Sequence, residues 1–263
     1  MGAMLLEGKT CIVSGVGSGL GQAIVAACVR EGAQVVLAAR NEAYLCEVVA
    51  ELDETGGRAL AVATDITDPE QCAALVAATC ERFGGVDVLV NNAAAAHALE
   101  PSETADLETW RRSFEVNVWG TLNLTRTVIP AMRAGGGGSI VMVSSMIVRK
   151  VESAAMGGYG ASKAALGHLC RTLAYELGCD NIRVNNVVPG WMWGPSAERA
   201  IALRARAEGR TEAEVIDDIC SEIPLGFIPP QEDCANAVVF FASDLARVIT
   251  GQSLDVNGGE AFH

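Results

Sequence analysis

The sequence predicts a single α/β domain with a Rossmann-like, doubly wound parallel sheet of about seven strands and helices on both faces. Short apolar runs alternate with longer amphipathic stretches along the chain, and this order is typical of a parallel sheet. The runs are apolar throughout, as expected for strands covered on both faces. No linker, charge block or internal repeat divides the 263 residues, so we expect one domain over 1–263.

The expected strands are rich in β-branched residues and are bounded by turn-forming residues. They are Thr10–Ser14, Gln34–Ala39, Ala59–Ala63, Val86–Val90, Ser139–Ser144, Ile182–Val188 and Ser253–Val256. One helix is predicted to begin at Asp68–Pro69, because aspartate suits the N-cap and proline suits the first helical position. The longest helices are expected around Thr104–Met132 and Gly157–Leu177.

One region departs from this alternation. About residues 191–230 form an Arg- and Glu-rich helical insert bracketed by prolines. An insert of this length predicts a helical lid over a substrate site.

Composition excludes several classes of function. Asp and Glu total 32 against 19 for Lys and Arg, which gives a net charge of -13. Such a protein repels phosphate backbones, so no nucleic-acid partner is expected. No apolar stretch approaches the roughly 20 residues of a membrane span, and the first residues lack a signal-peptide pattern. We therefore expect a cytoplasmic protein without a membrane partner.

The nine cysteines contain no C-x-x-C pair and are odd in number. This pattern favours reduced thiols packed as small apolar side chains rather than disulfides or zinc ligands. No His, Asp or Glu set has metal-ligand spacing, and no metal is expected.

A glycine-rich turn, SGVGSGLG, follows the first expected strand and opens a helix. Glycine permits a sharp turn and a close backbone approach to a pyrophosphate, which then binds at the helix N-terminus. The placement after the first strand predicts a dinucleotide site. The expected contacts of this turn are Gly15, Ser18, Gly19, Leu20 and Gly21.

Three further strand ends bear on the same site. Ala39 stands where a carboxylate that binds the ribose 2′-hydroxyl is usual in NAD sites, and Arg40 follows it. A guanidinium can bind a 2′-phosphate instead, which favours NADP over NAD; a solvated arginine is the alternative. Asp65 and Ile66 are expected to contact the adenine, and Asn92 to contact the cofactor. Alternatively, Asp65 caps a turn, and the Asn91 side chain bonds to loop backbone.

Tyr159 and Lys163 lie four residues apart in an expected helix and therefore share one face. A free tyrosine has a pKa of about 10, and a neighbouring cation lowers it towards a range useful for acid–base catalysis. The spacing carries weight because the chain has three tyrosines and three lysines. Ser145, after the fifth expected strand, can donate a hydrogen bond to a substrate carbonyl.

The glycine turn together with Ser145, Tyr159 and Lys163 resembles the short-chain dehydrogenase/reductase superfamily, in its single-domain branch of about 250 residues. The resemblance runs from about Leu6 to Gly259. Its further motifs are Asn91–Ala93, Asn117, Pro189–Gly190, Ile249–Gln252 and Asn257–Gly259.

This resemblance implies an NAD(P)-dependent oxidoreductase that interconverts a secondary alcohol and a ketone. It implies that Tyr159 is the general acid/base, that Lys163 lowers its pKa and binds the nicotinamide ribose, that Ser145 polarises the carbonyl and that Asn117 holds a water. Its further implied cofactor contacts are Pro189, Gly190 and Met192. Family members are often tetramers built on the two longest helices, so a homotetramer is expected.

The chain departs from the family pattern at three places. Ala94 replaces a glycine, and Ser14 replaces a threonine. The family also commonly has a threonine four residues after Pro–Gly, bonded to the cofactor, where this chain has Gly194. Ser196 or the backbone of Gly194 is expected to take its place.

Large apolar side chains follow Gly190 at Trp191, Met192 and Trp193. They favour an alicyclic, terpenoid, steroid-like or acyl substrate, with Trp191 and Trp193 as contacts; packing beneath the lid is the alternative. Arg149 and Lys150 are expected to be a solvated loop pair, or else to meet an anionic substrate group.

A catalytically inactive dinucleotide-binding sensor or scaffold is the competing class of function. It would use the glycine turn and would have no use for Ser145, Tyr159 and Lys163 together.

Overall fold

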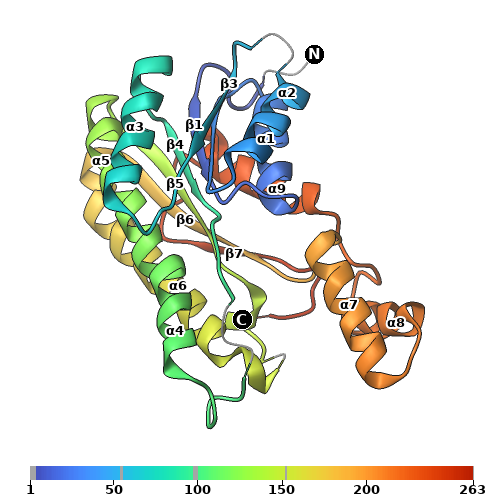
Figure 1. Ribbon diagram of the computed structural model, residues 1–263. Helices are drawn as coiled ribbons and strands as arrows, with labels where there is room; N and C mark the ends of the chain where they lie inside the picture. Colours follow the sequence, from blue (N-terminus) through green and yellow to red (C-terminus); the bar gives the residue numbers. More distant parts are fainter. Residues whose placement is uncertain (1–3, 54–55, 97–99, 152, 263) are drawn as a thin grey trace.

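The structure, a computed structural model, describes the chain except residues 1–3, 54–55, 97–99, 152 and 263. Seven parallel strands form one sheet in the order β3-β2-β1-β4-β5-β6-β7 (Figure 1). The strands are β1 Thr10–Ser14, β2 Gln34–Ala39, β3 Ala59–Ala63, β4 Val88–Asn91, β5 Gly138–Val143, β6 Ile182–Pro189 and β7 Ser253–Val256. The predicted fold class is confirmed, and the strand order reverses between β1 and β4.

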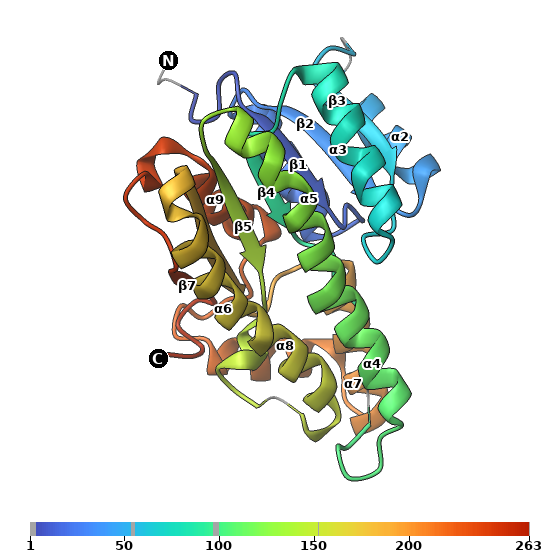
Figure 2. The same cartoon turned by 90° about the vertical axis from the view of Figure 1, so that its left-hand side faces the viewer.

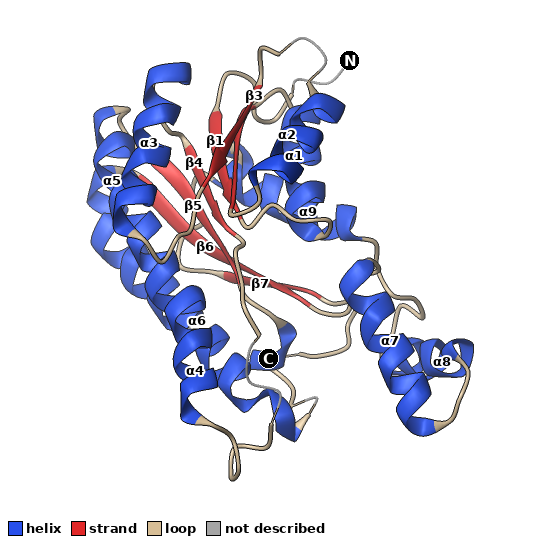
Figure 3. Cartoon of the chain, viewed as in Figure 1, coloured by secondary structure: helices blue, strands red, loops and turns tan. Residues whose placement is uncertain are grey.

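Helices cover both faces of the sheet (Figures 1 and 3). One layer contains α1 Leu20–Arg30, α2 Glu42–Leu52 and α9 Gln231–Ala242, and the other contains α3 Pro69–Phe83, α4 Leu107–Phe114, α5 Thr121–Ala134 and α6 Gly157–Leu177. Successive strand residues point to opposite layers. In β1, Cys11 and Val13 pack beneath the first layer, whereas Ile12 packs beneath the second.

The local helix signals act as expected at α3. Asp68 is its N-cap and accepts hydrogen bonds from the Glu70 and Gln71 N–H groups at 2.9 and 3.3 Å. The long helix expected around Thr104–Met132 begins three residues later, at Leu107, behind the N-cap Asp106. A π-helical turn, η1 Glu115–Gly120, joins α4 to α5. The two helices run on from one another as one long rod (Figure 2).

The short helical turns lie mostly at element ends. They are η2 Met146–Val148, η3 Ala154–Met156, η4 Gly178–Asp180 and η5 Asp244–Ala246.

Within the predicted insert, α7 Pro195–Glu208 and α8 Glu212–Glu222 project from the carboxyl end of the sheet (Figure 1). They share a small apolar core of Ile201, Ala205, Val215, Ile219, Ile223 and Ile228.

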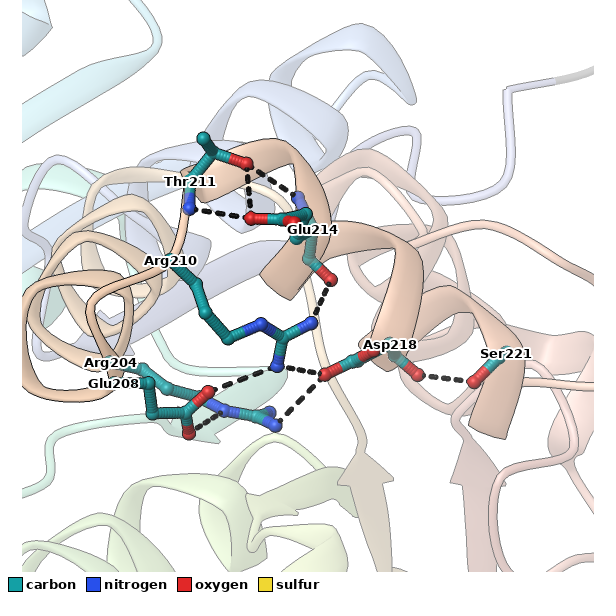
Figure 4. Close-up of polar contacts among 7 residues, drawn as sticks. All are labelled: Arg204, Glu208, Arg210, Thr211, Glu214, Asp218 and Ser221. Atoms are coloured by element: carbon teal, nitrogen blue, oxygen red, sulfur yellow. Dashed lines mark hydrogen bonds and ion pairs between the residues drawn. The ribbon is translucent and has the colours of Figure 1, made fainter.

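Polar contacts also join the two helices (Figure 4). Arg204 and Arg210 both bond to Glu208 of α7 and to Asp218 of α8. Thr211 and Glu214 form a capping box at the start of α8. The core and these contacts hold α7 and α8 together as a pair.

None of the helices in the described part of the chain has the length and apolar character that a membrane span needs. All nine cysteines are free thiols, and five of them are buried. The described residues contain no cluster of three or more His, Cys, Asp or Glu side chains that could hold a metal ion.

Candidate active site

A cavity of about 460 Å³ opens at the carboxyl ends of the strands, where the strand order reverses. Open parallel sheets bind ligands at this position. The cavity brings together four of the predicted cofactor residues, Gly15, Arg40, Asp65 and Ile66. Its other lining residues are Val16, Gly17, Ala39, Asn41, Thr64, Ala93, Ala94, Ala95 and Val116.

The glycine turn is packed too closely for side chains. Gly15 has a φ of 74°, in the left-handed region, and a Cβ there would collide with the backbone of Ala93. A Cβ on Gly21 would collide with the Gly15 carbonyl oxygen. Gly19 is the N-cap of α1 without a side-chain capping bond, and the flanking Ser18 is exposed. The first N–H groups of α1 are therefore available to an anion, which is what a dinucleotide diphosphate requires.

A small network ties this turn to the loop after β4. The Asn92 side chain donates to the Gly15 carbonyl at 2.9 Å. The Ser14 hydroxyl donates to the Val90 carbonyl at 3.3 Å and accepts from the Asn92 N–H, also at 3.3 Å. Both bonds are made by the Ser14 hydroxyl, which a threonine at this position would also have. The Asn92 amide is thus held on loop backbone, whereas the Asn91 amide, for which that role was the alternative, donates to Thr125 Oγ1 at 3.0 Å.

The predicted cofactor residues near the strand ends differ in their exposure and in the hydrogen bonds they already make. Arg40 is exposed at the end of β2, and its guanidinium makes no hydrogen bond or ion pair with a described residue. One Asp65 oxygen accepts from the Thr67 N–H and hydroxyl at 3.0 and 2.8 Å, which caps the turn. Ile66 borders the cavity but is itself 5% exposed within the core. Leu20 packs at the edge of the opposite core cluster.

Tyr159 and Lys163 lie on one face of α6, as their spacing predicts. The Lys163 Nζ is 5.9 Å from the centre of the Tyr159 ring and donates to the Val143 carbonyl at 2.8 Å. Lys163 is 2% exposed, and this burial lowers its pKa to about 8. Because Val143 is the last residue of β5, this bond fastens the face of α6 that carries Tyr159 to the carboxyl edge of the sheet.

Ser145 follows β5 directly and caps the turn η2, where its hydroxyl accepts from the Ile147 N–H at 3.4 Å. This weak bond uses the oxygen as an acceptor, so the hydroxyl proton remains available to a substrate oxygen. Ser145 is two residues beyond Val143, the acceptor of the Lys163 bond. Ser145 and the Lys163–Val143 bond therefore both lie at the carboxyl end of β5, and Tyr159 lies beside Lys163 on α6.

Asn117 lies in the π-helical turn and is fully buried. Its Oδ1 accepts from the Ala95 N–H at 2.7 Å, and its Nδ2 donates to the Ala95 carbonyl at 2.9 Å and to Ser162 Oγ at 2.8 Å. The Ser162 hydroxyl in turn donates to the Tyr159 carbonyl at 2.7 Å. Asn117 thus joins the loop after β4 to the helix that carries Tyr159, and π-turns are frequent at functional sites.

The segment after β6 separates its three large side chains. Pro189 ends β6, and the Gly190 N–H donates to the Val256 carbonyl at 3.0 Å. Met192 packs against the core beneath α1 and α9, whereas Trp191 packs against the core shared by α7 and α8.

Trp191 also lines a second cavity, of about 210 Å³, beside α7 and α8. The other lining residues are Lys150, Val151, Arg204, Ile219, Glu222 and Glu260. The structure does not bring Trp193 to this cavity: its side chain is 42% exposed, and its N–H donates to the Pro229 carbonyl at 2.8 Å.

The solvated-loop interpretation of Arg149 and Lys150 is wrong. Arg149 pairs with the nearly buried Asp255 at 3.2 Å, and Lys150 pairs with Glu222 and Glu260. Glu260 is a buried carboxylate that the sequence analysis did not single out, and burial raises its pKa. No local signal could have found these partners, because they lie 72 to 110 residues away in the chain.

The fold and the site define a class of protein: a dinucleotide-binding α/β protein that carries a serine and a lysine-bound carbonyl at the carboxyl end of β5 and a tyrosine beside the buried lysine on α6. Comparison with known proteins agrees. The family model described as enoyl-(acyl carrier protein) reductase matches residues 15–261. The 7alpha-hydroxysteroid dehydrogenase of Escherichia coli (strain K12) is 34% identical over 254 residues, 97% of this chain and 94% of that protein.

Two solved structures are also similar. L-sorbose reductase from Gluconobacter frateurii, complexed with NADPH and L-sorbose, has a TM-score of 0.91 at 34% identity and covers 98% of both chains. A 7alpha-hydroxysteroid dehydrogenase complexed with NADH and 7-oxo glycochenodeoxycholic acid has a TM-score of 0.87 at 33% identity, over 98% of this chain and 96% of that chain. This chain belongs to the short-chain dehydrogenase/reductase family, whose enzymes use NAD(P).

Proposed function

We propose that the protein interconverts a secondary alcohol and a ketone, with Tyr159 as general acid/base, on a substrate with an apolar cyclic, steroid-like or acyl body. The observation that carries the proposal is the buried Lys163 ammonium, held by the Val143 carbonyl on the face of α6 that carries Tyr159. A structural lysine has no need of such burial, which is costly for a charged group. The arrangement instead supplies a fixed positive charge beside a phenol.

The residues divide the reaction between them. When bound, NAD(P) supplies or accepts the hydride. In ketone reduction, the Tyr159 hydroxyl donates its proton to the substrate oxygen, and in alcohol oxidation the phenolate accepts it. The Lys163 ammonium favours the phenolate, and the Ser145 hydroxyl donates a hydrogen bond to the oxygen on which charge develops. Asn117 positions Tyr159 through Ser162 and, in the implied role, holds a water.

The substrate class is supported by the second cavity. Trp191, Val151 and Ile219 form an apolar part of its wall, and large flat side chains suit a ring or acyl chain. The segment 191–230 is proposed as the lid that covers the substrate. Lys150 is paired with two carboxylates, Glu222 and Glu260, so no positive charge is left over for an anionic substrate group.

The test is turnover of a panel of cyclic ketones, steroids, acyl ketones and their alcohols with NADPH and NADH, followed by nicotinamide absorbance. Turnover restricted to polyols, such as sugar alcohols, would contradict the apolar substrate class. Binding of NADPH without turnover of any panel member would contradict the reaction and favour the sensor or scaffold.

We propose NADP as the preferred cofactor, and the variant Arg40→Ala tests this. The exposed Arg40 guanidinium faces the cavity without a described partner, so it can bind a 2′-phosphate bidentately. Its loss is expected to raise the Kd for NADPH about tenfold or more and to leave the Kd for NADH nearly unchanged. Arg82→Ala, at the distant end of α3, is the matched control. An unchanged ratio of the two constants would contradict the role of Arg40.

We further propose a cytoplasmic homotetramer built on the α4–α5 and α6 surfaces. Apolar side chains that are exposed in the single chain support these surfaces: Leu107 (61% exposed), Trp119 (53%) and Tyr175 (92%). Light scattering on the purified protein measures the mass directly, and a monomer mass at micromolar concentration would contradict the proposal.

A further inference from the structure

The Gln231 side chain fills the space that a side chain at position 194 would need. A Cβ on Gly194 would overlap the Nε2 atom of Gln231 and lie 2.8 Å from its Cδ. The backbone itself does not demand glycine, because a φ of 161° and a ψ of -178° describe an extended conformation that any residue adopts. The Gln231 amide therefore occupies the space of a residue-194 side chain.

The same amide lies beside the cofactor turn. A Cβ on Gly19 would be 3.7 Å from Gln231 Nε2. Gly19 is the N-cap of α1, and Gln231 is the first residue of α9, which packs along α1. The Gln231 amide thus stands between the turn that binds a diphosphate and the segment that follows β6.

The amide is also free to bind a ligand. Gln231 is half-buried, and its side chain makes no hydrogen bond with a described residue. An amide NH2 carries two donors, and partly buried donors are stabilised by finding acceptors.

Ser196 and the Gly194 backbone, which the sequence suggests in place of the family's threonine, are less suitable than Gln231 as cofactor contacts. Ser196 is exposed in the first turn of α7, and the Gly194 carbonyl already accepts from the Glu198 N–H at 3.0 Å. The exposure of Ser196 does not favour a cofactor contact, and the Gly194 carbonyl is an acceptor that can offer a diphosphate no hydrogen bond.

We infer that Gln231 is a cofactor-binding residue whose Nε2 group donates a hydrogen bond to the diphosphate of NAD(P), in place of the threonine that Gly194 lacks. The inference rests on the family's cofactor and not on the proposed substrate. It makes Gly194 and Gln231 a coupled pair, since any side chain at 194 displaces the amide.

Binding titrations on the purified protein test the inference without measuring activity. Gln231→Ala is expected to raise the Kd for NADPH about tenfold, since the lost bond goes to a charged group. ADP-ribose, which keeps the diphosphate, should weaken equally, whereas adenosine 2′-monophosphate, which lacks it, should bind unchanged. Gln231→Glu should weaken NADPH more than Gln231→Ala does, because a carboxylate repels the diphosphate.

Gly194→Ala tests the coupling, because the added methyl group pushes the amide away from Gly19. It should raise the Kd for NADPH about as much as Gln231→Ala does. The Kd of the double variant should be no higher than that of either single variant. Gln252→Ala is the matched control, since Gln252 is exposed and bonds to Thr250. Thermal unfolding of each variant without ligand checks the fold.

The inference would be overturned if Gln231→Ala left the Kd for NADPH unchanged. It would also be overturned if the increases in Kd caused by Gly194→Ala and Gln231→Ala multiplied in the double variant. Wild-type protein that binds NADPH as described but turns over no alcohol or ketone would overturn the proposed reaction and leave this inference standing.

Discussion

Replacing Tyr159 with phenylalanine is expected to lower kcat about 10³-fold and to leave the Kd for NADPH within about twofold. The substitution removes only the hydroxyl, so the ring keeps its place on α6 and its contact with Lys163 at 5.9 Å. Without the phenol no proton is transferred to or from the substrate oxygen at that position. Single-turnover rates, followed by nicotinamide absorbance, measure the loss.

Tyr175→Phe is the matched control, because Tyr175 lies on the same helix, 16 residues beyond Tyr159, and the substitution likewise removes only a hydroxyl. It should turn over substrate at the wild-type rate. A Tyr159→Phe enzyme that keeps wild-type turnover would exclude the phenol as the acid/base and with it the proposed mechanism.

Replacing Lys163 with methionine is expected to have two opposite effects. It should lower kcat by about 10²–10⁴-fold, since the phenolate of Tyr159 loses its neighbouring cation. It should also raise the free energy of unfolding of the ligand-free protein at pH 7. Burial lowers the Lys163 pKa from 10.5 to about 8, which corresponds to a cost of about 3 kcal/mol for the charged form. Loss of the bond to the Val143 carbonyl offsets roughly 1 kcal/mol of the gain.

The pH dependence of the free energy of unfolding separates the desolvation of the Lys163 ammonium from the loss of its hydrogen bond. Between pH 8 and 10.5 the unfolded chain binds more protons at Lys163 than the folded chain, so the stability contribution of this lysine rises with pH. The advantage of the methionine variant should therefore be full below pH 8 and disappear by pH 10.5. Urea unfolding at several pH values measures the difference.

Lys9→Met is the control for the lysine substitution, because Lys9 pairs with Asp244 at 3.0 Å far from the site. It should leave turnover unchanged. A stability advantage of Lys163→Met that persists at pH 10.5 would show that its origin is packing rather than desolvation of the ammonium. An active Lys163→Met enzyme would contradict the role of the cation.

The elements of the fold were predictable because their signals are local. The apolar runs located all seven strands, with β1, β2, β3 and β7 at their observed bounds, and Asp68–Pro69 located the start of α3. The interruption of the long helix by η1 was not predicted. A π-turn depends on what the extra residue packs against, here the bonds of Asn117 to Ala95 and Ser162.

By itself the sequence determined the glycine turn, the doubly wound parallel class of the sheet and the shared face of Tyr159 and Lys163. These features depend on helical and strand periodicity, which is set within a few residues. Only the tertiary structure decided that Lys163 is buried against the Val143 carbonyl. It alone also placed the Gln231 amide beside Gly194. These contacts join residues 20 and 37 positions apart on different elements, and their distances are set by how helices pack on the sheet, which no local periodicity encodes.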